Sequence, residues 1–92
     1  MMYPFLTLED ETEIVHSEML ADGRVKVYLE KPDESDGFHH ATCYLPESEW
    51  TEITGFSEDE MTRYRKITEE MKPIILDFAQ KGGFRGASDI KD

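Results

Sequence analysis

The clearest pattern in the chain is a strict alternation of apolar and polar positions over residues 24–31. Every second position holds an aliphatic residue, namely Val25, Val27 and Leu29. Successive side chains of a β-strand point to opposite faces, so this stretch predicts a strand with one buried face. Residues 38–45 alternate in a similar way and predict a neighbouring strand.

Two more strand candidates precede these, over residues 3–8 and 12–20. Pro4 fits the edge of a sheet, where its missing N–H leaves no partner unsatisfied. The segment Ala21-Asp22-Gly23 predicts a three-residue hairpin loop in which Gly23 takes the left-handed conformation.

The loop length sets the register of the first hairpin. A three-residue loop pairs Val15 with Leu29 and groups apolar residues on one face. A two-residue loop at Asp22-Gly23 would instead place His16 opposite Leu29. We prefer the first register, which puts Val15 in the core and His16 on the opposite face.

A long amphipathic helix is predicted from Ser57 onward. Ser57 and Glu60 fit a capping box, and acidic residues suit the positive end of the helix dipole. A stripe then recurs at three- and four-residue steps: Met61, Tyr64, Ile67, Thr68, Met71, Ile74, Ile75 and Phe78. Pro73 predicts a kink or a break near Lys72, and Gly82 predicts the end of the helix.

These elements predict an α+β fold. We expect an antiparallel meander of three to four strands, with one face packed by a long, Pro-kinked C-terminal helix. Residues 47–56 predict an irregular segment or short helical turn, buried through Trp50, Ile53 and Phe56. With 92 residues, the chain fits a single domain over 1–82 and a flexible tail over 83–92. The predicted sheet side of the core comprises Val15, Met19, Val25, Val27, Leu29, Ala41, Cys43 and Leu45.

Charge and cysteine usage narrow the function classes. The chain has 21 acidic and 10 basic residues and a net charge of −11, which disfavours binding to nucleic acid or to an anionic membrane. Cys43 is the only cysteine, so no internal disulfide can form. The start of the chain has no signal-peptide pattern, and the run Ile74-Ile75-Leu76 is far too short to span a bilayer. We therefore expect a cytoplasmic protein.

Three segments carry a family resemblance. They are Gly23-Arg-Val-Lys-Val-Tyr-Leu-Glu-Lys-Pro, Asp36-Gly-Phe-His-His-Ala-Thr-Cys-Tyr-Leu-Pro, and Glu49-Trp50. Over roughly residues 3–82 the chain resembles small bacterial proteins classed as domains of unknown function. The resemblance implies a compact cytoplasmic bacterial protein and assigns no catalytic residue.

The sequence offers little support for metal or nucleophile chemistry. His39 and His40 point to opposite faces of a strand, and His39 and Cys43 lie about 13 Å apart. Zinc-ligand spacings and the Gly-x-Ser-x-Gly motif are absent from the sequence. We predict no metal, no cofactor and no catalytic residue, and the balance is against an enzyme.

The candidate binding residues lie on the polar side of the two central strands. They are Arg24, Lys26, Tyr28, Phe38, His40 and Tyr44, with His16 on the same face in the preferred register. Two interpretations of this face are open. The alkyl chains of Arg and Lys can cover aromatic rings, as on an ordinary solvated face. Exposed aromatic patches, in contrast, often mark contact surfaces.

Two functions fit this aromatic and basic face. The first is a small, acidic, non-enzymatic protein-interaction module, such as a regulatory or antitoxin-like subunit, that binds a protein partner or forms a homodimer. The alternative is a small-ligand-binding protein or minor enzyme with a shallow site formed by Lys26, Tyr28, His40 and Tyr44.

Overall fold

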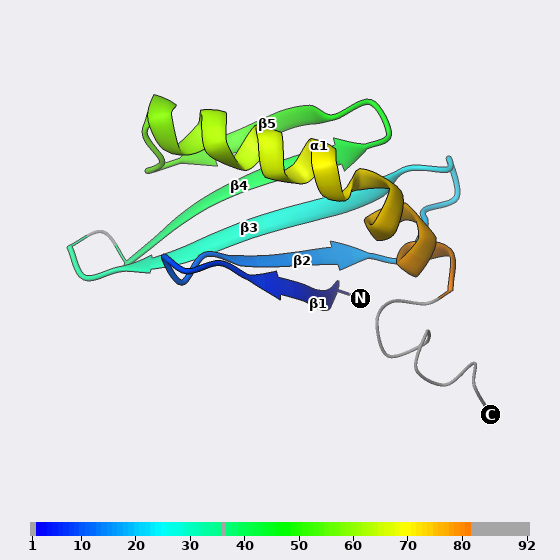
Figure 1. Cartoon of the computed structure of the whole chain (residues 1–92), viewed down its shortest axis with the longest axis horizontal. Helices are drawn as coiled ribbons and strands as arrows, with labels where there is room; N and C mark the ends of the chain where they lie inside the picture. Colours follow the sequence, from blue (N-terminus) through cyan, green and yellow to red (C-terminus); the bar gives the residue numbers. More distant parts are fainter. Residues whose placement is uncertain (1, 36, 82–92) are drawn as a thin grey trace.

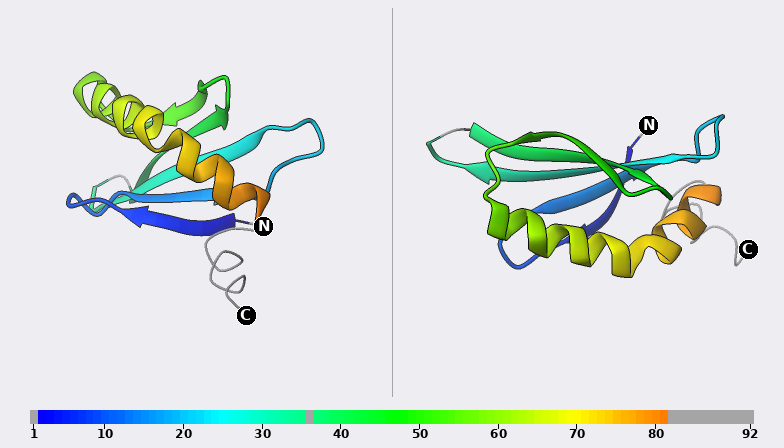
Figure 2. Two further views of the ribbon diagram at one scale, coloured as in Figure 1. Left: turned by 45° about the vertical axis from the view of Figure 1, so that its right-hand side comes forward. Right: turned by 90° about the horizontal axis from the view of Figure 1, so that it is seen from above.

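The fold is a five-stranded antiparallel sheet with one helix lying across one of its faces (Figures 1 and 2). The computed structural model describes residues 2–35 and 37–81. The strands lie side by side in chain order: β1 (Met2–Thr7), β2 (Glu13–Ser17), β3 (Val25–Asp33), β4 (Gly37–Leu45) and β5 (Glu49–Thr54). The α+β meander is confirmed, but it has five strands where three to four were predicted.

The strict alternation of β3 produces the sheet side of the core. Val25 faces Leu45, Val27 faces Cys43 and Leu29 faces Ala41 across the β3–β4 ladder. All six side chains are fully buried beneath the helix. Cross-strand partners share a face, so the residues between them point away from the helix.

The first hairpin keeps the predicted turn but not the predicted strand register. The N–H of Leu20 donates to the carbonyl of Arg24 (2.7 Å), and Gly23 has a φ of +86°. Further along, the Ser17 hydroxyl accepts the N–H of Lys26 (2.9 Å). Beyond that point the pairing has slipped by one residue, so that Ile14 faces Leu29.

The slip exchanges the faces of two residues, because strand side chains alternate. His16 faces Val27 on the core side and is 0% exposed, and Val15 lies half-buried on the opposite face. Both predicted orientations were therefore wrong. The sequence pattern does not predict that the Ser17 hydroxyl accepts the N–H of Lys26 in place of a strand carbonyl.

The segment predicted to be irregular forms the fifth strand. Trp50 faces Cys43 and packs against the core, and Phe56 also contacts the core. Ile53 is 40% exposed, contrary to the prediction that it is buried. Glu52 has a φ of +55° at a point where the β4–β5 register shifts. This irregularity interrupts the alternation from which a strand is predicted.

Helix α1 (Glu58–Gln80) begins as predicted. The Ser57 hydroxyl accepts the N–H of Glu60, and the Glu60 carboxylate accepts the N–H of Ser57. The helix runs through Pro73 as one element, so the proline does not divide it, and the predicted kink is not confirmed. Pro73 is exposed, which leaves water free to reach the carbonyl that lacks its usual partner.

A polar cluster joins the β1–β2 loop to α1. The Tyr64 hydroxyl donates to the Asp10 carboxylate (2.7 Å) and shares a hydrogen bond with the Thr12 hydroxyl (2.9 Å). Thr12 also donates its N–H to Asp10, and Arg63 forms an ion pair with the same carboxylate (3.1 Å). Burial raises the pKa of Asp10, but the hydrogen bonds and Arg63 outweigh it and lower the pKa to about 2. Burial raises the pKa of Tyr64 to about 12, so its hydroxyl stays protonated.

Two predictions concern the ends of elements and the membrane. Gly82 and the tail over 83–92 lie outside the described residues. Within residues 2–35 and 37–81, none of the helical structure combines the length and the apolar character needed to cross a bilayer.

Candidate functional site

The side of the sheet that faces away from α1, here called the outer face, carries all six predicted binding residues. Lys26 faces Tyr44 across the β3–β4 ladder, and Pro32 faces Phe38. Tyr28 and His40 stack on this side, and Arg24 lies over the Tyr44 ring. Figure 2 shows α1 on one side of the sheet only, and no described helix or strand covers the outer face.

The rings of the outer face are held in place by contacts within the chain. The Arg24 guanidinium lies 4.6 Å from the centre of the Tyr44 ring, a cation–π contact. The Tyr28 and His40 rings have centroids 6.1 Å apart and planes 28° apart. Thr42, which faces Tyr28, is only 1% exposed although no element lies over it. Rings that already pack against neighbours of their own chain lose less conformational entropy when a partner covers them than free side chains do.

The charges of the outer face are only partly paired. Arg24 binds Asp22 (2.9 Å) and lies 3.7 Å from Glu49. Among the described residues, the ammonium of Lys26 and the carboxylate of Glu30 have no ion-pair partner. Lys26 and Glu30 therefore remain available to charges brought by a partner.

Tyr28 lies between the unpaired cation and the unpaired anion. Burial, followed by the charges of Glu30 and Glu52, raises the pKa of Tyr28. The phenol therefore stays protonated at neutral pH and can donate a hydrogen bond to an incoming group.

An acidic concavity lies at one end of the outer face. It has a volume of about 300 Å³ and is lined by Thr7, Glu11, Glu13, Glu30, Pro32 and Phe38. Glu13 and Glu30 face each other directly across the β2–β3 ladder, an arrangement in which like charges repel. Phe38, at 54% exposure, is the most exposed large apolar side chain of the described residues. Phe38 was among the predicted binding residues, but the three glutamates were not, because their assembly depends on the β2 register.

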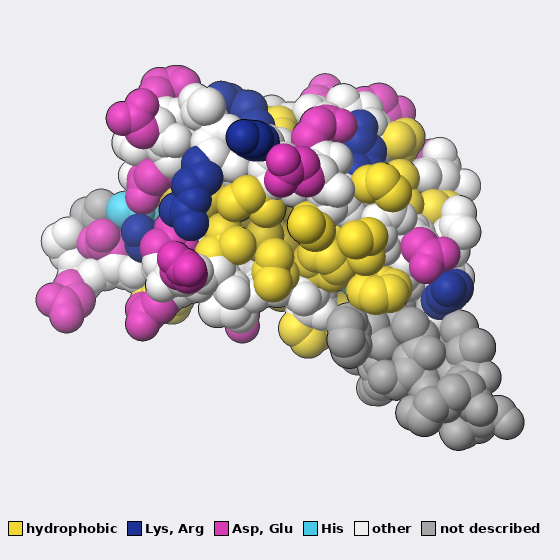
Figure 3. All heavy atoms as spheres, in the orientation of Figure 1, with side chains coloured by type: hydrophobic (Ala, Val, Ile, Leu, Met, Phe, Trp, Pro, Cys, Tyr) yellow, Lys and Arg dark blue, Asp and Glu magenta, His cyan; other side chains and the backbone are white. Residues whose placement is uncertain are grey.

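A second surface, which the sequence did not reveal, lies on the helix side. Glu69 and Lys72 of α1 contact the β4–β5 loop, so the opposite flank of the helix faces β1 and β2. Figure 3 shows hydrophobic side chains gathered there, between the helix and the first two strands. We call this surface the apolar strip, and it includes Phe5, Ile67, Met71, Ile74 and Phe78.

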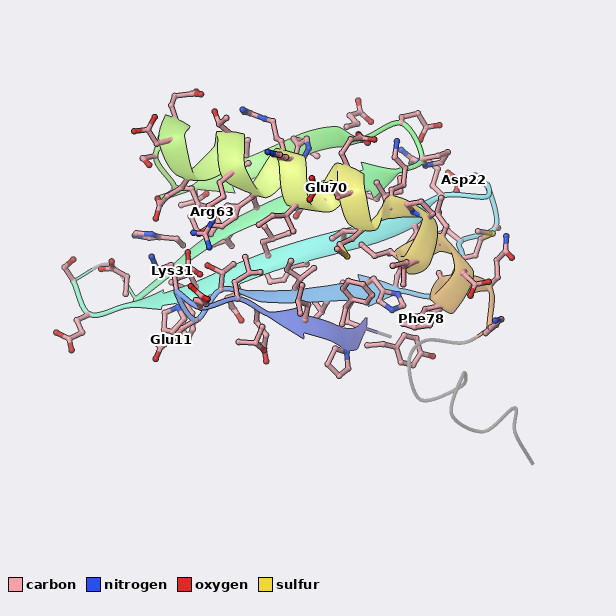
Figure 4. All side chains as sticks on the ribbon, viewed as in Figure 1. Glu11, Asp22, Lys31, Arg63, Glu70 and Phe78 are labelled. Atoms are coloured by element: carbon pink, nitrogen blue, oxygen red, sulfur yellow. The ribbon has the colours of Figure 1, made fainter. Side chains whose placement is uncertain are left out.

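The apolar strip includes part of the helix stripe that recurs at three- and four-residue steps. Ile74 belongs to that stripe but is 44% exposed. The ring of Phe78, labelled in Figure 4, lies 5.9 Å from that of Phe5 on β1. The helix therefore leaves part of its apolar side uncovered above the first two strands. No periodicity within α1 could show this, because it depends on where the helix crosses the sheet.

Cys43, His39 and His40 do not come together in one site. Burial raises the pKa of the Cys43 thiol to about 12, and its side chain points into the core. His39 packs edge-on against Phe56 and lies 3.6 Å from Asp33, on the side opposite His40. Over residues 2–35 and 37–81, no three His, Cys, Asp or Glu side chains are grouped so that they could hold a metal ion.

Comparisons of the chain with protein-family models, with curated proteins and with solved structures find no match. The resemblance to bacterial domains of unknown function therefore stays a prediction.

Proposed function

We propose that the chain is a non-enzymatic protein-interaction module that binds a partner protein or a second copy through its outer face. It would act as a small regulatory or antitoxin-like subunit in the cytoplasm. The observation that carries the proposal is the set of packed rings on an uncovered sheet face. Arg24 over Tyr44 and Tyr28 against His40 create a surface with both apolar area and hydrogen-bonding groups.

Surfaces of this composition favour proteins over small molecules. Tyrosine and arginine are enriched at protein interfaces and among the residues that dominate binding energy. Small ligands instead bind in concave sites that enclose most of their surface. The concavity on this face is lined by Glu11, Glu13, Glu30 and Phe38, among others, and lies at the end of the face away from Tyr44.

The arrangement of chemical groups favours a binding role over catalysis. Cys43 is buried on the opposite side of the sheet, and burial raises the pKa of its thiol far above neutral pH. His40 stacks on Tyr28, in an arrangement that also suits a contact surface. The alternative, a shallow ligand or catalytic site at Lys26, Tyr28, His40 and Tyr44, predicts a small molecule bound at the same residues.

Affinity purification with a matched pair of variants tests the proposal. The tagged full-length chain is compared with Tyr28→Ser/Tyr44→Ser, which removes two rings from the outer face. Arg65→Ser, on the exposed surface of α1, serves as the control. The eluates are weighed by native mass spectrometry, and circular dichroism establishes that each variant is folded.

We expect a protein or a second copy in fixed stoichiometry with the natural chain and with Arg65→Ser, and its loss with the double tyrosine variant. A partner that binds all three chains equally would refute a role for the outer face. A retained small molecule that is lost with the tyrosines would support the alternative instead.

A further inference from the structure

The charges on the central strand are arranged so that the outer face is complementary to a second copy of itself. Lys26, Tyr28 and Glu30 occupy successive outward positions of β3, the middle strand of the sheet. At two-residue steps, the cation and the anion each lie about 7 Å from Tyr28, on opposite sides of it. Consider a two-fold axis that lies between two facing copies, passes above Tyr28 and runs at right angles to β3. This axis places Lys26 of one copy over Glu30 of the other.

We infer that the partner of the outer face is a second copy of this chain, packed face to face with its strands antiparallel. The inference rests on the proposed function and specifies the occupant of the same surface. In this arrangement Lys26 of each copy meets Glu30 of the other, and the Tyr28 rings meet near the axis. Closed two-fold pairing of identical patches is the commonest form of homo-oligomer.

The charges also select between the two ways of packing this face on itself. If the strands of the two copies ran parallel, Lys26 would meet Lys26 and Glu30 would meet Glu30. Like charges in contact disfavour an interface, so the parallel arrangement is rejected. The antiparallel arrangement turns both of these contacts into ion pairs.

A second glutamate, Glu13, makes the site beside Glu30 more favourable for a cation from a partner. Glu13 faces Glu30 across the β2–β3 ladder, and among the described residues neither carboxylate has an ion-pair partner. The Lys26 ammonium likewise has no partner within its own chain. An ammonium from the second copy would reach a site where two carboxylates repel each other.

The net charge sets the conditions for association. Each copy carries −11, so two copies repel each other at long range. Salt at about 0.15 M reduces the range of this repulsion to about 8 Å, while contacts at the interface are screened less. The dimer is therefore measured at that salt concentration.

Charge reversal and complementation provide the test. Sedimentation equilibrium of the full chain is measured up to about 500 µM, alongside Lys26→Glu, Glu30→Lys and an equimolar mixture of the two. The matched controls are Lys66→Glu and Glu70→Lys, which change the net charge equally on the exposed surface of α1. One member of each mixture is labelled with ¹⁵N, so that native mass spectrometry separates mixed from identical pairs.

We expect the natural chain and both controls to dimerise. Each single reversal should raise the dissociation constant at least about tenfold, because two ion pairs become two repulsions. The mixture should recover to within about threefold of the natural chain, as a mixed pair. A parallel arrangement predicts a different pattern, in which neither single reversal weakens the dimer and the mixture associates more tightly than the natural chain. A dimer formed elsewhere predicts that the reversals at positions 26 and 30 change the dissociation constant no more than the two control reversals do.

Cross-linking keeps the inference testable if a reversed variant does not fold. Under mild oxidation, a mixture of Lys26→Cys and Glu30→Cys should cross-link much faster than Lys26→Cys alone. Cys43 does not interfere, because it is buried in the core.

Three outcomes would overturn the inference. These are a natural chain that stays monomeric, a dimer that neither reversal weakens, and a dimer lost in Ile74→Glu through the apolar strip. A monomeric chain that still captures a protein through its outer-face tyrosines would refute self-association alone. A dimer through the apolar strip, together with capture independent of those tyrosines, would refute the proposed function as well.

Discussion

The ionised carboxylate of Asp10 should contribute about 2 kcal/mol to the stability of the fold. Its pKa falls from an ordinary value of 3.8 to about 2 in the folded chain. One pKa unit corresponds to about 1.4 kcal/mol of preference for one protonation state, which gives this magnitude. Asp10→Asn keeps the size and a hydrogen-bonding oxygen but removes the charge that Tyr64 and Arg63 bind.

Urea unfolding followed by the fluorescence of Trp50, the only tryptophan, measures this loss. At neutral pH, Asp10→Asn should lower the free energy of unfolding by about 2 kcal/mol. Asp77→Asn is the control, because its exposed pair with Lys81 is worth about 0.5 kcal/mol or less. All chains are compared at one protein concentration.

The pH dependence gives a stricter test of the same reasoning. The folded pKa is depressed, so the stabilisation is complete above about pH 4 and is lost as the pH falls toward about 2. The difference between the natural chain and Asp10→Asn should shrink over that range. A difference that stays constant down to about pH 2, or one no larger than that of Asp77→Asn, would refute the assignment.

Three further predictions concern single positions. Gly55→Ala should cost about 2 kcal/mol or more in the same urea titration, because a methyl group there would overlap the His39 ring and φ is +89°. Gly37→Ala, which has the same φ and open space around it, should cost only about 1 kcal/mol, and equal losses would contradict the steric explanation. Cys43 should resist iodoacetamide at about pH 8 in the folded chain and react once unfolded, as checked by mass spectrometry, since burial raises the pKa of its thiol to about 12; rapid labelling of the folded chain would show that the core opens. Ser57→Ala should lower the free energy of unfolding by about 1 kcal/mol through loss of the helix cap, and an unchanged urea midpoint would show that the capping box adds nothing.

Local patterns in the sequence sufficed where one element determines its own structure. The alternation around Val27 predicted the central strand and its buried face, and Ser57 with Glu60 predicted the start of the helix. The six outer-face residues were grouped correctly because the alternation within each strand determines which of its side chains share a face.

Features that depend on contacts between elements were not accessible in this way. The Ser17 hydroxyl shifts the β2 register, which moved His16 into the core and brought Glu13 opposite Glu30. The fifth strand was not predicted, because the irregularity at Glu52, where φ is positive, interrupts its alternation of apolar and polar residues. The apolar strip follows from the path of the helix over the sheet, which no residue of the helix specifies alone.

The order of elements along the chain has a consequence for how the protein folds during synthesis. Each strand pairs only with its neighbours in sequence, so the whole sheet can assemble through short-range hairpin closures. The helix that covers it is made last, and two of its buried contacts, Tyr64 and Ile75, lie eleven residues apart along it. A nascent chain that ends before Tyr64 therefore carries a paired sheet whose apolar face, centred on Val27, is open to water. Such a chain is exposed to aggregation and is a natural substrate for chaperones until α1 emerges.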